Sequence, residues 1–371
     1  MRRVLVVTQF AISQMLIIGA IVIAGQMRFS KNADLGFKKD AIVMLPLPVN
    51  DLNRISTMGT RLQGLAGVQS VSFCYQPPAS ESNNTTDVRF EGRAKDEPWE
   101  VNMKQADDQY VNTFGLKIIA GRNFYKSDTT RELLVNETFV KKLGFRTPQE
   151  VLGKRANVDG DNPAPIVGVV KDFYNRSFHE DVAPIIIRPN YTVYSKCAVN
   201  IAGGDIKPVL AQIEKTWNET YPDFVYSYQF LDDSIAKFYE LDDVMLILIE
   251  TFAVIAVFIG CLGLYGLVSF MAVRKTKEIG VRKVLGAGMQ QILWLFGKEF
   301  SQLLLLAFVI AAPIAFWVMT LYLEDFKYRI TIGAGIFALS IGVTFLVACL
   351  TVGYRSLRAA MANPVKSLRT E

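Results

Sequence analysis

Four long apolar runs constrain the fold of this 371-residue chain more than any other feature of its sequence. They predict membrane-spanning helices at residues 1–25, 244–273, 292–323 and 332–354, because a helix needs ~20 mostly apolar residues to cross a bilayer. The interval between the first and second runs, 26–243, is polar and long enough to form a core of its own. A mean hydropathy of +0.24 with 20% charged residues fits such a mixed architecture.

The basic residues gather beside these runs and predict how the chain is oriented. Arg and Lys cluster before the first run, after the second and after the fourth, whereas 26–243 holds slightly more Asp and Glu than Lys and Arg. Because Lys and Arg are retained on the cytoplasmic side of a membrane, both termini, the segment 274–291 and the tail 355–371 are expected inside. The interval 26–243 and the short loop 324–331 are then outside. This placement explains the net charge of +5 without nucleic acid as a partner.

The outer interval is predicted to be an α+β domain, since short apolar runs alternate with amphipathic segments. Its final segment, 231–241, is expected to run as a helix straight into the second span. The other expected elements are strands at 41–46, 68–74, 86–90, 99–104, 117–120, 166–170, 185–188, 198–201 and 224–230 and helices at 51–65, 107–114, 137–143 and 208–221.

Two covalent questions stay open at the level of sequence. The first 25 residues have the basic start of a cleaved signal peptide, but their apolar run is longer than is usual for one, so we expect a retained span. Cys261 and Cys349 fall inside spans. Cys74 and Cys197 lie in the outer interval, where a disulfide is chemically allowed, but the sequence does not place them within reach of each other.

The segment between the second and third spans is built like a short helix on a cytoplasmic surface. Its apolar residues recur at helical spacing, and Glu278 precedes Arg282 by four residues, the favoured order for an ion pair. Such a helix, held between two spans, can receive force from a soluble partner. The residues expected to carry this contact are Arg274, Lys277, Glu278, Ile279, Gly280, Arg282, Lys283, Leu285 and Gly286.

Three further features lie within the spans. Gly260, Gly263 and Gly266 place small residues at regular spacing, which favours close helix packing either within one subunit or between subunits. Glu250 is a carboxylate inside the second run, which is a functional hypothesis by default, but near the outer interface it can simply reach water, and we favour that interpretation. Pro313 predicts a kink in the third span.

The sequence argues against an enzyme. It holds no G-x-x-x-x-G-K-[ST] phosphate-binding loop, so ATP hydrolysis by this chain is not expected. Its single histidine, His179, rules out a histidine-based metal cluster, and no acid partner places Ser177 beside it as a nucleophile. We therefore expect no cofactor and no metal.

The order of one span, a large outer domain and three spans, with RKTKEIGVRKVLGAG at 274–288, resembles the FtsX-like permease family, in the branch of ABC transporters that includes MacB and LolC/LolE. The tail ANPVKSLR at 362–369 is similar to the end of that family. Weaker similarities lie in the outer interval at 121–124, 135–137 and 166–173. The resemblance implies a mixed fold, with a two-lobed α+β periplasmic domain of residues 26–243 inserted between helices 1 and 2 of a four-helix membrane unit.

The same resemblance implies a function. The chain would be a permease subunit in the bacterial inner membrane that turns ATP hydrolysis in a separate cytoplasmic ATPase into periplasmic motion, driving efflux or extraction of a periplasmic or lipophilic substrate. Implied partners are that ATPase, a second permease subunit in a homo- or heterodimer, a periplasmic adaptor or outer-membrane protein, and membrane lipids. The alternative is a signalling or scaffold protein of FtsX type that regulates a cell-wall hydrolase or a sensor.

Overall fold

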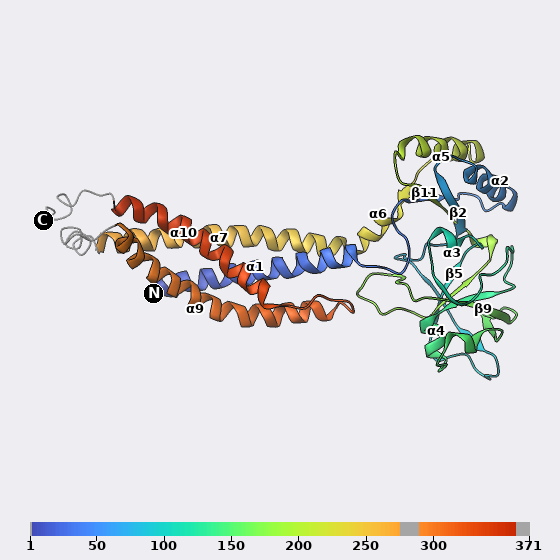
Figure 1. Cartoon of the computed structure of the whole chain (residues 1–371), viewed down its shortest axis with the longest axis horizontal. Helices are drawn as coiled ribbons and strands as arrows, with labels where there is room; N and C mark the ends of the chain where they lie inside the picture. The colour runs from blue at the N-terminus through green and yellow to red at the C-terminus, as the bar shows by residue number, and fades with distance from the viewer. Residues whose placement is uncertain (1, 275–288, 361–371) are drawn as a thin grey trace. The chain divides into compact units, whose positions relative to one another are not determined.

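The computed structural model describes residues 2–274 and 289–360 (Figure 1). The chain divides into two compact units. One contains residues up to Lys31 and from Leu241 onward, and the other is Asn32–Glu240. We call them the membrane unit and the outer domain, and describe each by itself.

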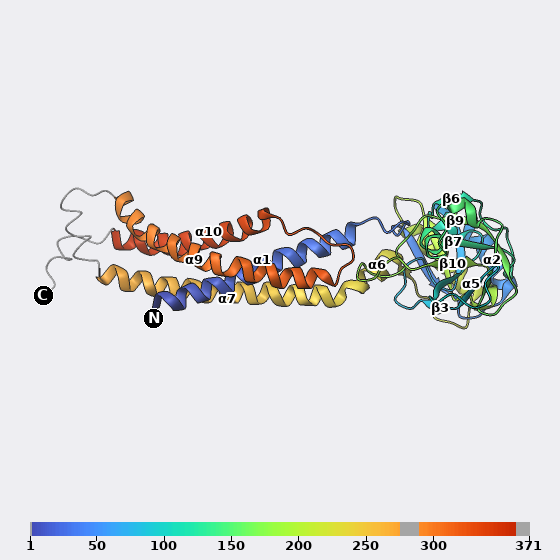
Figure 2. The same ribbon diagram turned by 90° about the horizontal axis from the view of Figure 1, so that it is seen from below.

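The membrane unit contains four helices that are long and apolar enough to cross a membrane, as expected. They are α1 (Arg2–Asn32), α7 (Glu240–Arg274), α9 (Met289–Glu324) and α10 (Ala334–Ala360), and they run alongside one another in Figures 1 and 2. Half of the apolar stretch of α1 is buried, against 11% for α7, so α1 is the most buried of these four helices.

All four helices contribute to the core of this unit. Phe10 of α1, Leu264 of α7, Leu304 of α9 and Ala348 of α10 belong to one buried cluster. Near the other end of α1, the side-chain amide of Gln26 is buried. Its oxygen accepts a hydrogen bond from the backbone N–H of Ile330, and its nitrogen donates one to the backbone carbonyl of Tyr328. Gln26 therefore fixes the connection between α9 and α10, because its amide takes the place of a backbone partner.

The first lobe of the outer domain is a four-stranded sheet in the order β12-β1-β11-β2, covered by two helices. Its helices are amphipathic: α2 buries Ile55, Met58 and Leu62, and α5 buries Ile213 and Trp217 against the same core. The elements are β1 (Ile42–Pro46), α2 (Leu52–Gln63), β2 (Val68–Cys74), β11 (Lys196–Ile201), α5 (Lys207–Thr220) and β12 (Gln229–Phe230).

The second lobe is a larger mixed sheet in the order β3-β5-β10-β7-β9-β8-β4, with β6 paired to β9. Phe139 of α4 and Ile166 of β9 are fully buried in its core. The elements are β3 (Asn84–Thr86), β4 (Val88–Phe90), β5 (Val101–Gln105), β6 (Ile118–Gly121), β7 (Leu133–Asn136), α4 (Glu137–Lys142), β8 (Arg155–Val158), β9 (Ala164–Val170) and β10 (Ile185–Arg188). The short helix α3 (Tyr110–Thr113) lies between β5 and β6 in the chain but packs on β2 and β11 of the first lobe.

The backbone stays helical from the outer domain into α7. Residues 231–236 form α6 and 237–239 form a 3-10 turn, after which α7 begins at Glu240. Three expectations were wrong in extent. The strand expected at 86–90 is divided at Asp87 between β3, which pairs with β5, and β4, which pairs with β8. The strand expected at 224–230 is reduced to β12, and in the residues before β12 the ring of Tyr226 packs on Trp217 of α5. The helix expected at 107–114 is only the short α3.

The two outer cysteines are buried and free. Cys74 is opposite Lys196 in the β2–β11 ladder, whereas Cys197 is opposite Phe73. Because neighbouring residues of a strand point to opposite faces of the sheet, the two thiols project to opposite sides and no bridge joins them. Burial raises the pKa of both thiols well above their ordinary range, which makes them unreactive.

Candidate functional site

The expected coupling residues fall almost entirely outside the part of the chain that the structure describes. Arg274 is the last residue of α7, and α9 begins at Met289. The remaining eight, Lys277, Glu278, Ile279, Gly280, Arg282, Lys283, Leu285 and Gly286, lie between these helices and outside the described residues. Their contact with a partner stays a prediction.

Two of the three glycines of α7 face α1 of the same chain. A Cβ at Gly260 would lie 3.3 Å from the ring of Phe10, and one at Gly263 would lie 2.4 Å from the side-chain oxygen of Gln9. Among the described residues, nothing lies within 4 Å of a Cβ at Gly266. Gly260 and Gly263 therefore allow α7 to pack closely against α1 of the same subunit, as small residues do between membrane helices. Glu250 is exposed on the same helix.

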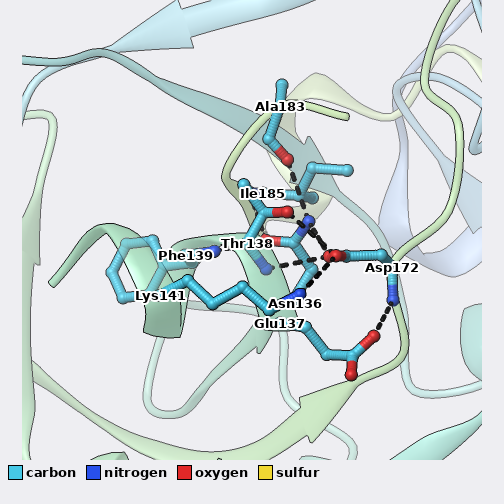
Figure 3. Close-up of polar contacts among 8 residues, drawn as sticks. All are labelled: Asn136, Glu137, Thr138, Phe139, Lys141, Asp172, Ala183 and Ile185. Carbon is cyan, nitrogen blue, oxygen red and sulfur yellow. Dashed lines mark hydrogen bonds and ion pairs between the residues drawn. The ribbon is translucent and has the colours of Figure 1, made fainter. Parts of the chain in front are cut away.

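Two segments of the outer domain, 135–137 and 166–173, showed a weak similarity to the FtsX-like permease family in the sequence. In the structure they meet in one polar network around Asp172 (Figure 3). One oxygen of Asp172 accepts hydrogen bonds from the Asn136 amide and from the backbone N–H of Thr138, both at 2.8 Å. The other accepts from the Thr138 hydroxyl at 2.9 Å and lies 3.5 Å from the ammonium of Lys141. The Glu137 carboxylate in turn accepts from the backbone N–H of Asp172.

The sheet topology explains why these residues meet. Strands β7 and β9 are parallel neighbours, so their carboxyl ends, which carry Asn136 and Asp172, lie at the same edge of the sheet. Asn136 also caps α4 through Phe139 and accepts from the backbone N–H of Ile185. Each side chain of this network forms at least one hydrogen bond or ion pair within the chain, which fits a structural role in holding β7, β9 and α4 together.

The segment that begins at Asp172, residues 172–179, contacts the residues that follow α1 and those that precede α7. We call it the base strap. On one side, the Tyr174 backbone N–H donates to the carbonyl of Leu35 at 2.9 Å, and the Phe173 ring packs edge-on against Phe37. On the other side, the Phe178 backbone N–H donates to the hydroxyl of Tyr239 at 3.1 Å. The strap thus joins the residues that follow α1 to those that precede α7.

Gly36 makes the first of these contacts possible. Its φ of +83° is a conformation that favours glycine. A Cβ at this position would lie 2.7 Å from the carbonyl oxygen of Asp172. The backbone of the connection therefore lies directly against the start of the base strap, with no room for a side chain between them.

A cleft of about 1010 Å³ opens where the two lobes meet, between α2 and the segment 126–131. Asp107 stands in its wall and joins the lobes, because its carboxylate accepts hydrogen bonds from the Ser72 hydroxyl at 2.6 Å and the Phe73 backbone N–H at 2.8 Å. Burial raises the pKa of Asp107 to about 7, although both hydrogen bonds favour the charged form. The rim carries Asp128 and Arg131. Within the described residues, no group of His, Cys, Asp and Glu has a metal-binding arrangement.

Sequence reasoning missed Asp107 and the buried Lys104. Lys104 lies in β5, every residue of which is buried, and donates to the Pro77 carbonyl at 3.0 Å and the Asn83 side chain at 2.6 Å. Burial lowers the pKa of Lys104 to about 7. Alternation of polar and apolar residues is typical of a strand with one solvent-facing side, and in β5 only the tertiary structure covers that side.

Comparisons with known proteins match nearly the whole chain. Residues 11–216 match the family described as MacB-like periplasmic core domain, and residues 250–364 match the family described as FtsX-like permease C-terminal. The chain is 23% identical over 327 residues to the uncharacterised ABC transporter permease YknZ of Bacillus subtilis, covering 84% of this chain and 78% of that protein.

A second relative is the macrolide export ATP-binding/permease protein MacB 2 of Aeromonas hydrophila, 27% identical over 288 residues. The alignment covers 71% of this chain but only 42% of that protein, so the matched part spans less than half the length of the MacB relative.

Two solved structures are also similar. The periplasmic region of MacB from Actinobacillus actinomycetemcomitans is 14% identical, with a TM-score of 0.38, covering 53% of this chain and 91% of that one. The extracellular domain of the YknZ transporter from Gram-positive bacteria is 16% identical, with a TM-score of 0.36, covering 50% of this chain and 98% of that one.

Proposed function

The chain belongs to the family of FtsX-like permeases with a MacB-like periplasmic core domain, and we propose that it converts ATP hydrolysis by a separate cytoplasmic ATPase into motion of its outer domain. It is an ABC transporter permease of the MacB and FtsX-like type. The observation that carries the proposal is the extent of the FtsX-like match, residues 250–364, which contains the whole basic segment between α7 and α9. In this proposal that segment docks on the ATPase.

The geometry of the outer domain supports transmission of such motion. The base strap joins the residues after α1 to those before α7 through Leu35 and Tyr239. The Asp172 network anchors the start of the strap to β7, β9 and α4. A displacement of either connection would therefore reach the second lobe through hydrogen-bonded and packed groups, which are the physical routes by which coupling travels.

In this proposal the chain itself is not catalytic and uses no cofactor. It works in the bacterial inner membrane with its outer domain in the periplasm, as one subunit of a permease homo- or heterodimer, and a periplasmic adaptor or outer-membrane protein completes the complex. The transported cargo is a periplasmic or lipophilic substrate that is expelled or extracted. The purified chain should hydrolyse no ATP, and turnover that disappears on mutation of this chain would contradict the proposal.

The docking proposal is tested by reversing charge in the basic segment. The double variant Arg282→Glu/Lys283→Glu should lose several-fold in ATPase co-purification, because charge complementarity with the partner is lost. Insertion in the membrane should be unchanged, since Arg274, Lys275 and Lys277 remain to orient the spans. Replacing Gly286 by valine should have the same effect if the turn there needs a positive φ.

The matched control is Lys366→Glu/Arg369→Glu, which makes the same charge change in the cytoplasmic tail. ATPase recovery, membrane insertion and function in cells are measured side by side for all variants. If the 282/283 and 286 variants keep full ATPase binding and function, the segment is only an orientation signal. The identity of the outer partner separates transport from the alternative: an adaptor or outer-membrane channel supports transport, and a cell-wall hydrolase supports a regulator of FtsX type.

A further inference from the structure

A second cleft, of about 700 Å³, lies in the outer domain between the end of β1, the segment 75–82 and the segment 227–238. We call it the hydroxyl cleft because five serines line it. They are Ser80, Ser82, Ser195, Ser227 and Ser234. It shares no lining residue with the inter-lobe cleft around Asp107.

One buried acceptor in the wall of the cleft lacks a partner. Gln76 is only 7% exposed, and its amide nitrogen donates to the Ser82 hydroxyl at 3.2 Å. Its amide oxygen has no hydrogen-bond partner among the described residues. A buried carbonyl left unsatisfied costs ~1–3 kcal/mol, so the site favours a ligand that brings a hydroxyl or amine donor to this oxygen.

The charged groups of the cleft favour an anion. Lys196 and Lys237 line it, and within the described part of the chain neither forms an ion pair. Glu81 is the one acidic residue in the lining. The Ser195 and Ser234 hydroxyls each donate to a backbone carbonyl, which leaves their oxygens free to accept hydrogen bonds from ligand hydroxyls. The rings of Tyr228 and Phe238 supply apolar contact.

The chain places one wall of this cleft close to a span in the sequence. Lys237 and Phe238 belong to the 3-10 turn that leads directly into α7. From Lys237 to Val244, where the apolar run begins, the helix rises only ~10 Å at ~1.5 Å per residue. Only six residues therefore separate Lys237 from the apolar run of α7.

We propose that the hydroxyl cleft binds the phosphorylated polyol headgroup of an anionic membrane lipid, such as phosphatidylglycerol. Lys196 and Lys237 hold the phosphate, a role in which lysine acts as a point charge. The Gln76 oxygen and the serine hydroxyls take the hydroxyls of the headgroup. A zwitterionic choline headgroup brings no hydroxyl donor for Gln76 and adds a positive charge beside the lysines. This site is independent of ATPase docking, so either proposal can fail without the other.

The test uses photocrosslinking from inside the cleft in the full-length protein. Tyr228, which lines the cleft and is 44% exposed, is replaced by the photoreactive residue benzoylphenylalanine. The protein is reconstituted in nanodiscs of phosphatidylglycerol or of phosphatidylcholine and illuminated, and lipid adducts are counted by mass spectrometry. We expect adducts with phosphatidylglycerol at several times the yield with phosphatidylcholine. The same probe at Tyr125, which is 70% exposed and does not line the cleft, should show no such preference.

Two sets of variants complete the test. Lys196→Gln/Lys237→Gln should reduce the phosphatidylglycerol adduct to the phosphatidylcholine level, and Gln76→Leu should reduce it as well. The matched control, Lys95→Gln/Lys215→Gln, changes two exposed lysines that do not line the cleft and should leave the yield unchanged. Equal yields with both lipids, or no effect of the 196/237 variant, would overturn the proposal.

A soluble polyol phosphate could bring the same phosphate and hydroxyl groups to the cleft without a lipid. Glycerol 3-phosphate is therefore added to the phosphatidylglycerol nanodiscs before illumination. A lipid bound through the cleft and anchored in the bilayer should resist millimolar competitor, which would support the proposal. If glycerol 3-phosphate binds and no lipid adduct forms, the lipid source is wrong.

Discussion

Asp107 is an ionisable residue at the contact between the two lobes, and its raised pKa predicts how the stability of the fold depends on pH. Its pKa is raised to about 7 in the folded protein from an ordinary value of 3.8. Between these values the folded state binds a proton that the unfolded state has released, so stability falls as pH rises from about 4 to about 7. Asp107 as a whole residue is only partly buried, so solvent screening limits the effect to on the order of 1 kcal/mol.

The Asp107→Asn variant removes this titration. The free energy of unfolding of the full-length protein in detergent, followed by tryptophan fluorescence, should then depend less on pH between 4 and 7 than that of the wild type. Asp223→Asn, at an exposed position without a hydrogen-bond partner among the described residues, is the control and should keep the wild-type slope. Parallel profiles for all three proteins would show that burial of Asp107 has no thermodynamic consequence.

Buried polar residues also mark the limit of what the sequence predicts. Lys104 and Asn102 alternate with apolar residues in β5 and read as a solvent-facing edge, yet both are buried. The segment that covers Lys104 contains Pro77 and Asn83, and no local pattern shows that it folds back there. By contrast, the ends of β2 were predicted correctly, because its apolar run is bounded by clear turn residues.

Among the elements, the base strap gives the most direct mechanical test. Gly36→Ala places a Cβ at 2.7 Å from the Asp172 carbonyl at a positive φ. Gly92→Ala is the matched control, since Gly92 has a φ of +81° but nothing within 4 Å of its Cβ position. Both substitutions carry the left-handed strain of ~1–2 kcal/mol, and only Gly36→Ala also pushes the connection away from the strap.

We expect Gly36→Ala to lower stability by ~1–3 kcal/mol more than Gly92→Ala, because overpacking adds to the backbone strain. It should also uncouple the permease, with ATPase binding kept and transport in cells lost. Unfolding, ATPase co-purification and transport are measured for both variants. If Gly36→Ala behaves like Gly92→Ala in all three, the contact between the connection and the strap does not transmit motion.

The boundaries of helices and strands were predicted well where a local sequence pattern marks them and poorly where tertiary packing decides them. Helices α2 and α5 lie within a residue or two of their predicted ranges, because amphipathic spacing marks both. The predicted strand at 224–230 failed because alternation of aromatic residues also fits an irregular segment whose rings pack on α5. The glycines of α7 were noticed in the sequence, but their partner helix, α1, was not predictable from helical spacing alone.

At the scale of the whole molecule, the four apolar helices and the α+β outer domain follow from hydropathy and alternation, and their order along the chain carried the family resemblance. The inter-lobe cleft and the hydroxyl cleft did not follow from the sequence. Each is lined by segments far apart in the chain, such as Gln76 and Lys237. Such sites depend on how the sheet orders its strands, which single-sequence patterns do not specify.

The orientation of the whole molecule is the last prediction. The Lys and Arg distribution places both termini and the 274–288 segment in the cytoplasm and the outer domain outside. Single cysteines at Asn162, an exposed position in the turn between β8 and β9, and at Lys283 report on the two sides. In intact spheroplasts, a membrane-impermeant maleimide should label Asn162→Cys and spare Lys283→Cys until the membrane is lysed.

The native cysteines should contribute little background labelling in this experiment. Cys74 and Cys197 are fully buried in the outer domain, so the folded protein should react there only after denaturation, which serves as the internal control for folding. Cys261 and Cys349 lie in the spans and are replaced by alanine. Because the positive-inside bias depends on Lys and Arg near the spans, converting the 274–288 basic residues to glutamine should weaken it and raise the fraction of inverted chains. Labelling of Lys283→Cys before lysis, with Asn162→Cys protected, would contradict the predicted topology. It would also contradict the ATPase-docking proposal, because the 274–288 segment would then lie outside the cytoplasm.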